Sequence, residues 1–266
     1  MNSEITVFIP VRNGAEFIGK TIESVLMQSF SNWQLIIKDN CSSDKTKDIV
    51  AKFIGDPRIL WMERDQNIGA EGNFNSCLTD IPTKYYMILS HDDYLFSTQA
   101  LEKAYNILET HPDIPKVHCD MMFVDEYSQS IAPRRFRRSG RVSSDNIAKK
   151  SILSVRNMYG IPLLIRANAV NEHRYQFYYA SDIDFSVGIG KGMDIYHIPE
   201  ILIALRIHKN NNTQRKYDSI APELRLIAEK NRIHLTKWDH VVMVFNDYLQ
   251  RIQKKIFFLY LAHFRK

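Results

Sequence analysis

Short apolar runs alternate with helically spaced apolar residues through the first half of the chain. Four runs are typical of buried strands: Ile5–Pro10, Trp33–Lys38, Ile59–Met62 and Tyr85–Leu89. The spacing between and after them predicts helices over Ala15–Gln28, Asp44–Phe53 and Leu101–Leu108, and a further strand over Val117–Val124. This alternation favours an α/β fold, with a Rossmann-like, mostly parallel central sheet flanked by helices.

The second half of the chain is less regular. We predict strands over Ile161–Arg166 and Asp194–Leu205, a helix over Ser181–Ile189, and helix from Tyr217 to the end. The resulting division has one α/β domain over 1–212, in two halves over 1–95 and 96–212, and a helical C-terminal extension over 213–266.

Composition narrows the class of protein. With 45% hydrophobic and 11% aromatic residues in 266, the chain can bury a core, which excludes general disorder. Its net charge of +5 favours anionic partners without indicating nucleic acid. Three cysteines without paired spacing favour reduced thiols over a disulfide framework. Neither a signal peptide nor an apolar run of about 18 residues is evident, so we expect a cytoplasmic location.

Polar side chains gather where the predicted strands end. Asn13, Asp39, Asp92 and Asp93 each follow such an end. In open α/β sheets the ligand binds beyond the carboxyl ends of the strands. These four side chains are therefore expected to share one site.

The stretch ITVFIPVRNG…IESVLMQSFSNWQLIIKDNCSSDKT resembles the opening of family 2 glycosyltransferases, which have the GT-A fold. The matching positions are Pro10, Asn13, Ser24, Gln28, Asp39, Asn40, Ser42 and Asp44. The resemblance continues over about residues 5–210, through Asn67-Ile-Gly69…Asn73-Phe-Asn75, Ser90-His-Asp92-Asp93, Ser181-Asp182-Ile-Asp184-Phe185 and Arg206-Ile-His208. It implies an inverting transferase that moves a sugar from a nucleotide-sugar, by default a UDP-sugar, to a hydroxyl of a glycan or lipid-linked acceptor in cell-surface polysaccharide synthesis.

The same resemblance implies that 1–212 is a catalytic domain, with a nucleotide-binding half over 1–95 and an acceptor-binding half over 96–212, and it implies a donor site. Its predicted members are Pro10, Arg12, Asn13, Asp39, Asn67, Asn73, Asp92 and Asp93. Asp39 would accept from the base or ribose, although a carboxylate there can also cap the following loop, and Asp44 is first expected to be a cap. Arg12 replaces the aromatic residue usual in the family.

Asp92 and His208 match the family's metal-binding positions, which implies a cofactor of Mg²⁺ or Mn²⁺. Ser90 stands where the family carries the first aspartate of its acidic motif. Asp182 matches the catalytic base, the carboxylate that removes the acceptor proton. Asp184 is expected to be a surface or capping group.

Two other functions compete with the transferase. Gly14–Thr21 (GAEFIGKT) fits the P-loop pattern of nucleotide hydrolases after a strand. However, Phe17 and Ile18 belong to the apolar stripe of the predicted helix, and Glu16 would repel a phosphate. A catalytically silent GT-A binding or scaffold protein is the other alternative, because the acidic motif is altered at Ser90.

Two basic segments have open interpretations. Pro133–Arg141 (PRRFRRSGR) is expected to be a loop or hairpin that faces either a diphosphate-linked acceptor or solvent. The terminal stretch Lys254–Lys266 mixes aromatic and aliphatic residues with cations. Peripheral contact with the inner face of the plasma membrane, a homodimer contact and packing on the catalytic domain all remain open for it.

Overall fold

The structure is a computed structural model that describes residues 3–170, 173–177, 179–209 and 219–264, with side chains described as far as Gln253. Its strands are β1 (Ile5–Val11), β2 (Trp33–Asp39), β3 (Ile59–Glu63), β4 (Tyr85–Ile88), β5 (Tyr94–Leu95), β6 (Lys116–Val124), β7 (Ser130–Arg134), β8 (Gly140–Ser143), β9 (Pro162–Arg166) and β10 (Asp194–Arg206). The α-helices are α1 (Ile18–Leu26), α2 (Thr46–Val50), α3 (Gly69–Ser76), α4 (Ala100–Thr110), α5 (Ser144–Ser154), α6 (Ser181–Gly190), α7 (Ala221–Lys230) and α8 (Lys237–Phe264).

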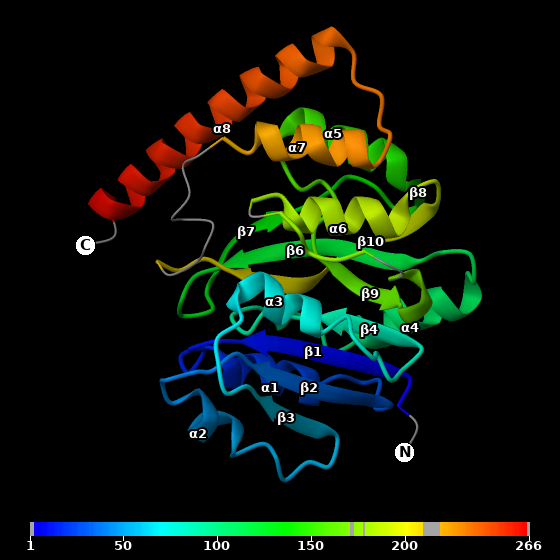
Figure 1. The fold of residues 1–266 in the computed structure, drawn as a ribbon. Coiled ribbons are helices and arrows are strands. Elements are labelled where there is room, and N and C mark those ends of the chain that lie inside the picture. The colour runs from blue at the N-terminus through cyan, green and yellow to red at the C-terminus, as the bar shows by residue number, and fades with distance from the viewer. Residues whose placement is uncertain (1–2, 171–172, 178, 210–218, 265–266) are drawn as a thin grey trace.

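All the described strands join one sheet in the order β3-β2-β1-β4-β9-β6-β10-β5, with β7 beside β6 and β8 beside β10 (Figure 1). The first four strands along this order are parallel to one another. β9 is antiparallel to both β4 and β6, so β6 runs in the same direction as β4. β10 is parallel to β6 and therefore shares this direction. The predicted α/β class with a helix-flanked central sheet is confirmed.

Helices cover both faces of the sheet because the strands alternate apolar side chains between the faces. Ile5, Val7 and Ile9 of β1 pack with residues of α1 and α4 in the largest core cluster. Phe8, which points to the opposite face, packs with residues of α3 and α6. This double cover explains why β1 reads as an uninterrupted apolar run.

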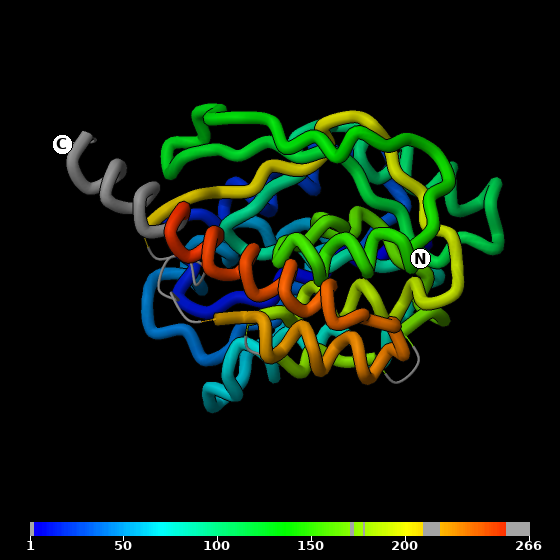
Figure 2. Tube along the Cα trace, turned by 90° about the horizontal axis from the view of Figure 1, so that it is seen from above, coloured from blue at the N-terminus to red at the C-terminus, as the bar shows by residue number. Residues whose placement is uncertain are grey.

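A further layer of helices lies on α6. Residues of α5, α6, α7 and α8 share a core cluster that contains Ile152, Ile183, Leu224 and Met243. α7 and α8 run side by side at the outside of this layer (Figure 2). The segment predicted as a C-terminal extension is thus packed on the 96–212 half through α7 and α8.

Among the elements that local patterning missed are α3, β5 and α5. α3 (GAEGNFNS) contains two glycines and buries only Asn73, so it shows no apolar stripe. β5 has two residues, too few for a period to be read. In the described part of the chain, no helix has both the length and the apolar character to cross a membrane.

Candidate active site

The carboxyl ends of the parallel strands meet at one edge of the sheet. Val11 at the end of β1 is in register with Asp39, and Asp39 with Glu63. Beside them, the Leu89 N–H donates to the carbonyl of Phe8, which brings the chain after β4 to the same edge. β10 ends there too, since it runs parallel to β6. The predicted site residues after β1, β2, β4 and β10 therefore lie along a common edge.

The loops after β1 and β2 are tied together by short polar side chains. The Asn13 N–H donates to Ser42 Oγ (2.8 Å), and Asn13 Oδ1 accepts from the Ser43 N–H (2.8 Å). Asn13 adopts a left-handed conformation (φ 54°), which asparagine tolerates better than most residues. The buried Asp39 accepts from the Ser42 N–H (2.9 Å) and from the Ser42 hydroxyl. Asp39 therefore caps the loop, and its nucleoside contact stays a prediction.

Asn73 and Asn67 hold the start of α3 against this edge. Asn73 is buried, and its Nδ2 donates to the carbonyls of Lys38 (3.0 Å) and Val11 (3.4 Å). Its Oδ1 is buried and has no hydrogen-bond partner among the described residues. Asn67 is exposed and accepts from Asn40 Nδ2 (2.8 Å). Both are near the predicted donor site, and their nucleotide contacts stay predictions.

Asn40 is a residue whose role the sequence did not reveal. It is 1% exposed, accepts from the Ile68 N–H and donates to the Gly69 carbonyl. It thus joins the end of β2 to the segment that opens α3. Of the other predicted donor residues, Pro10 is buried and Arg12 is exposed at the site edge.

Asp92 and His208 come together although 116 positions separate them. His208 Nε2 lies 3.0 Å from Asp92 Oδ2, and the His208 ring packs on Phe17 with 4.7 Å between ring centroids. Desolvation acts to raise the pKa of Asp92, but the hydrogen bond to His208 and the neighbouring His91 bring it below its ordinary value. An ionised carboxylate and a neighbouring imidazole nitrogen together form a suitable pair of metal ligands.

The pair fits a divalent ion that takes its other ligands from substrate and water. Mg²⁺ is commonly held by one or two carboxylates plus substrate phosphates rather than by a cage of protein groups. No group of three or more His, Cys, Asp or Glu side chains suited to a metal occurs among the residues that the structure describes.

Arg206 fastens the turn that carries Asp92. Its N–H donates to Asp93 Oδ1 (2.9 Å) and its Nε to the Asp92 carbonyl (2.9 Å). The buried guanidinium also donates to the carbonyls of Asp125 (3.0 Å) and Glu126 (3.1 Å). Burial, with the charge of Asp92, raises the pKa of Asp93 well above its ordinary value. Asp93 thus anchors β10, and its predicted donor contact stays a prediction.

His91 fills the space that Gly14 leaves. A Cβ on Gly14 would lie 2.6 Å from His91 Cδ2 and 2.6 Å from Val11 Cγ2. The His91 ring is hydrogen-bonded to the backbone of Pro10, and burial lowers its pKa. His91 is therefore a neutral packing group between β1 and the Asp92 turn, and Gly14 is required for its fit.

Asp182 occupies the first turn of α6. Its side chain is open to solvent, yet desolvation by the surrounding protein raises its pKa. Asp182 also acts electrostatically on Asp93 and on Tyr175, so the predicted base lies near the Asp92 turn.

The expectation for Asp184 is wrong. Its side chain is 2% exposed and forms an ion pair with Lys230 Nζ of α7 (2.8 Å). The spacing from Asp182 placed it on another face of α6 correctly, but that face meets α7 rather than solvent. The capping prediction for Asp44 is confirmed, since Asp44 accepts from the N–H groups of Ala15 and Thr46 (both 3.0 Å).

The P-loop alternative conflicts with the geometry of Gly14–Thr21. The N–H groups of Gly14 and Ala15 donate to Thr46 and Asp44 side chains, and those of Phe17 and Ile18 to the Gly14 carbonyl. A phosphate cradle needs such groups free and convergent. Lys20 lies on α1 with its Nζ 4.8 Å from the Tyr94 ring centroid. The segment is the start of a helix.

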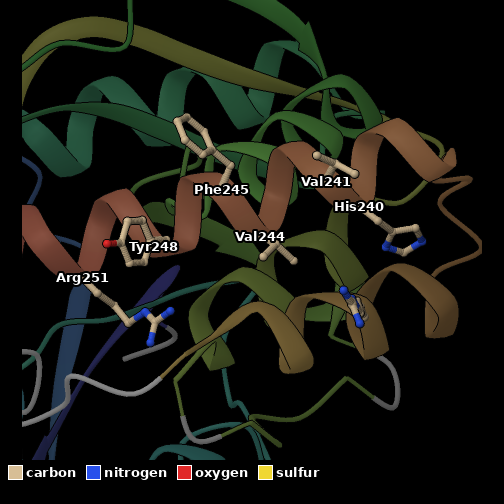
Figure 3. A pocket seen from close by; sticks show the side chains of 7 residues that line it. His240, Val241, Val244, Phe245, Tyr248 and Arg251 are labelled. Atoms are coloured by element: carbon tan, nitrogen blue, oxygen red, sulfur yellow. The ribbon is translucent and has the colours of Figure 1, made fainter.

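A separate hollow of about 560 Å³ lies on the outer helices (Figure 3). Its lining is Arg225 of α7 with His240, Val241, Val244, Phe245, Tyr248 and Arg251 of α8. It shares no residue with the site at the sheet edge. The basic segment Pro133–Arg141 ends β7, forms a loop and enters β8. β7 pairs with β6 and β8 with β10, so the segment is not a hairpin. Its Arg141 pairs with Asp113 and Asp194.

Comparison with known proteins agrees with this geometry. The family model described as Glycosyl transferase family 2 matches residues 6–172. An uncharacterized glycosyltransferase of Rickettsia prowazekii is 27% identical over 215 residues, which cover 79% of this chain and 65% of that protein. The chain therefore spans about 65% of the length of that curated relative.

A relative with a named reaction is the UDP-Glc:alpha-D-GlcNAc-diphosphoundecaprenol beta-1,3-glucosyltransferase WfaP of Escherichia coli, 35% identical over 95 residues (36% of this chain, 38% of that protein). Two solved structures share the fold. S. aureus TarS 1-349 in complex with UDP-GlcNAc has a TM-score of 0.71 at 17% identity, covering 98% of this chain and 73% of that one. The Pyrobaculum calidifontis mannosyltransferase in complex with GDP-Man and Mn²⁺ has a TM-score of 0.59 at 14% identity, covering 92% and 74%.

Proposed function

Because the chain belongs to glycosyl transferase family 2, we propose that it transfers a sugar, with inversion, from a UDP-sugar to a hydroxyl of a glycan or lipid-linked acceptor in cell-surface polysaccharide synthesis. The observation that carries this proposal is the pairing of Asp92 with His208 beside Asp182 at the carboxyl edge of the sheet. A donor diphosphate and an acceptor hydroxyl would both have a partner there.

The choice of UDP follows two comparisons. WfaP is named for a UDP-glucose donor and for an acceptor linked through a diphosphate to undecaprenol. TarS is known in complex with UDP-GlcNAc. The exposed Arg12 and Asn67 and the loop around Asn13 and Asp39 border the space proposed for the nucleoside.

Asp92 and His208 would hold Mg²⁺ or Mn²⁺. Such an ion neutralises the charge that grows on the departing diphosphate. The two side chains suit this role only while Asp92 is ionised and His208 is neutral, because a protonated ligand cannot coordinate. Arg206 keeps the Asp92 turn in place from behind.

Asp182 is proposed as the general base. The acceptor oxygen forms a bond to the anomeric carbon, the bond from that carbon to the diphosphate oxygen breaks, and UDP leaves with the bonding electrons. The acceptor proton passes to the Asp182 carboxylate. A raised pKa makes this carboxylate a stronger base than an ordinary aspartate, which favours the transfer.

The test uses water as the acceptor. Purified protein is incubated with UDP-glucose or UDP-GlcNAc and Mn²⁺, and released UDP is measured with and without EDTA. Slow release that stops with EDTA, together with thermal stabilisation by UDP and Mn²⁺, is expected. Binding of UDP without any release from either donor would instead support the catalytically silent scaffold.

We also propose that the protein works at the inner face of the plasma membrane through α8. Its outward face is apolar, with Trp238 71%, Val241 55%, Phe245 59% and Tyr248 55% exposed, while Asn246 of the inward face donates to α5. Arg225 and Arg251 lie beside that face. Cations beside exposed aromatic side chains suit a surface of anionic lipid.

Vesicle flotation distinguishes the occupants of this face. Binding to vesicles that contain phosphatidylglycerol, but not to pure phosphatidylcholine vesicles, is expected, and Phe245→Ser should reduce it. A concentration-dependent dimer without vesicle binding would show that a second copy covers the face instead.

A further inference from the structure

α6, the helix that presents Asp182, begins without a capping side chain of its own. Its N-cap residue is Ala180, and alanine is among the poorest residues at that position. The hydrogen-bond acceptor for the backbone at this helix start is a side chain of α7. Glu223 Oε2 accepts from the N–H groups of Tyr179 and Ala180, each at 2.8 Å. A carboxylate at this place also suits the positive end of the helix dipole.

The other end of α7 holds the same segment. Lys230 Nζ lies 2.8 Å from Asp184 Oδ2 and 3.0 Å from Gln176 Oε1. It also lies 5.8 Å from the centroid of the Phe177 ring. α7 therefore contacts the chain on both sides of Asp182, before α6 and within its first turn.

The approach to α6 is fixed on its opposite side by α3. Asn75 Nδ2 donates to the Tyr175 carbonyl (2.9 Å), and Asn75 Oδ1 accepts from the Tyr175 N–H (2.8 Å). The Tyr175 ring stacks on Phe185 of α6, with 4.4 Å between centroids. Any movement of the α6 start is thus resisted from α3 as well as from α7.

From these contacts we infer that α7 belongs to the catalytic apparatus, and that Glu223 is a positioning residue that sets where the Asp182 carboxylate stands. The inference rests on the proposed function, in which Asp182 is the base. Asp182 follows the N-cap by two positions, so unwinding the uncapped turn would displace its carboxylate. A displacement of about 1 Å can lower a rate by about 10²-fold.

The experiment compares Glu223→Ala and Glu223→Gln with Glu229→Ala, a control on an exposed glutamate of the same helix. UDP release from UDP-GlcNAc with Mn²⁺ is measured below the melting temperature of each variant. Glu223→Ala should lower kcat about 10- to 100-fold while KM for the donor stays within about 2-fold. Glu223→Gln keeps an oxygen acceptor and should recover most of the rate, and Glu229→Ala should match the parent.

A double-mutant cycle separates positioning from general stabilisation. In the Asp182→Asn background the residual rate should no longer respond to Glu223→Ala, because there is no base left to misplace. A full Glu223→Ala effect in that background, or a normal kcat in Glu223→Ala, would overturn the inference and leave the proposed function intact. A normal rate for Asp182→Asn alone would overturn the proposed base itself.

Discussion

The two parts of the site are built in different ways. At the ends of β1 and β2, short polar side chains bind backbone close by in sequence or one strand away: Asp39 holds Ser42, three positions on, and Asn13 holds Ser43. Around the proposed base, the contacts span the chain: Glu223 reaches back 43 and 44 positions to the start of α6, and Asn75 reaches forward 100 to Tyr175.

The difference lies in what each part must do. The first part shapes loops that the strands have already brought together, and small residues beside a strand end suffice for that. The second must place one carboxylate against groups from separate layers of the fold. Its precision therefore depends on how α3, α6 and α7 pack, and substitutions far from the site should affect it.

The largest expected effect is at the base. Asp182→Asn should lower kcat for UDP release by about 10²- to 10⁴-fold. Binding of UDP and Mn²⁺, measured by calorimetry, should stay near the parent value because Asp182 is placed on the acceptor side. An Asn variant with parental turnover would remove Asp182 from the mechanism.

The raised pKa of Asp182 sharpens this prediction. Since the base must be ionised, kcat should fall as the pH is lowered, with a midpoint above the ordinary aspartate pKa of about 3.9. The residual kcat of Asp182→Asn should not show this fall. At pH values between the pKa of Asp182 in the unfolded chain and its higher pKa in the folded protein, the folded protein binds more protons than the unfolded chain. The stabilising contribution of the neutral group is therefore full below the unfolded pKa and is lost as pH rises through the folded pKa.

Next in size is Arg206→Met, compared with Arg166→Met. Both arginines donate to several backbone carbonyls, but Arg166 lies beside Tyr85 at the opposite edge of the sheet. Each substitution should lower the free energy of unfolding, measured by chemical denaturation, by about 3 kcal/mol, because buried backbone carbonyls lose their hydrogen-bond donors. Only Arg206→Met should also weaken UDP–Mn²⁺ binding. Equal binding losses in the two variants would mean that Arg206 has no particular tie to the site.

A smaller effect distinguishes the two glycines of the apparent P-loop. Gly14→Ala should destabilise the protein by about 1–3 kcal/mol, since the new Cβ meets His91 and Val11 at 2.6 Å. Gly19→Ala meets only Ile49 at 3.5 Å and lies inside α1, so it should stabilise by up to about 1 kcal/mol. Urea denaturation measures both, and a reversed order would contradict the fit of His91 against Gly14.

The smallest effect is expected at Lys20. Lys20→Ala removes a contact with the Tyr94 ring worth about 0.5–1 kcal/mol and should leave UDP release within about 2-fold of the parent. A P-loop hydrolase would lose its activity with this lysine. Loss of UDP release in Lys20→Ala would thus revive that alternative.

Much of the site at the ends of β1 and β2 could be predicted from the sequence, and less of the surroundings of Asp182. The strand ends at Asp39 and Asp92 follow from apolar runs that stop abruptly. The burial of Asp184, its pairing with Lys230 and the cap from Glu223 could not be predicted, because each depends on which face of α6 meets α7. Ala180 offered a faint signal, as a helix start without a capping residue.

The amino-acid sequence by itself determined the alternation of strands and helices, the common edge at which the polar strand ends meet, and the family. The alternation and the common edge follow from hydrogen-bond periodicity and from the placement of apolar residues, which act over a few positions. The family was indicated by the resemblance of the motifs. The resemblance already implied that Asp92 and His208 share a site, whereas only the tertiary structure decided that they are in direct contact and that α7 caps the helix of Asp182. Such contacts join segments whose separation along the chain carries no periodic pattern, so they exist only once the layers have packed.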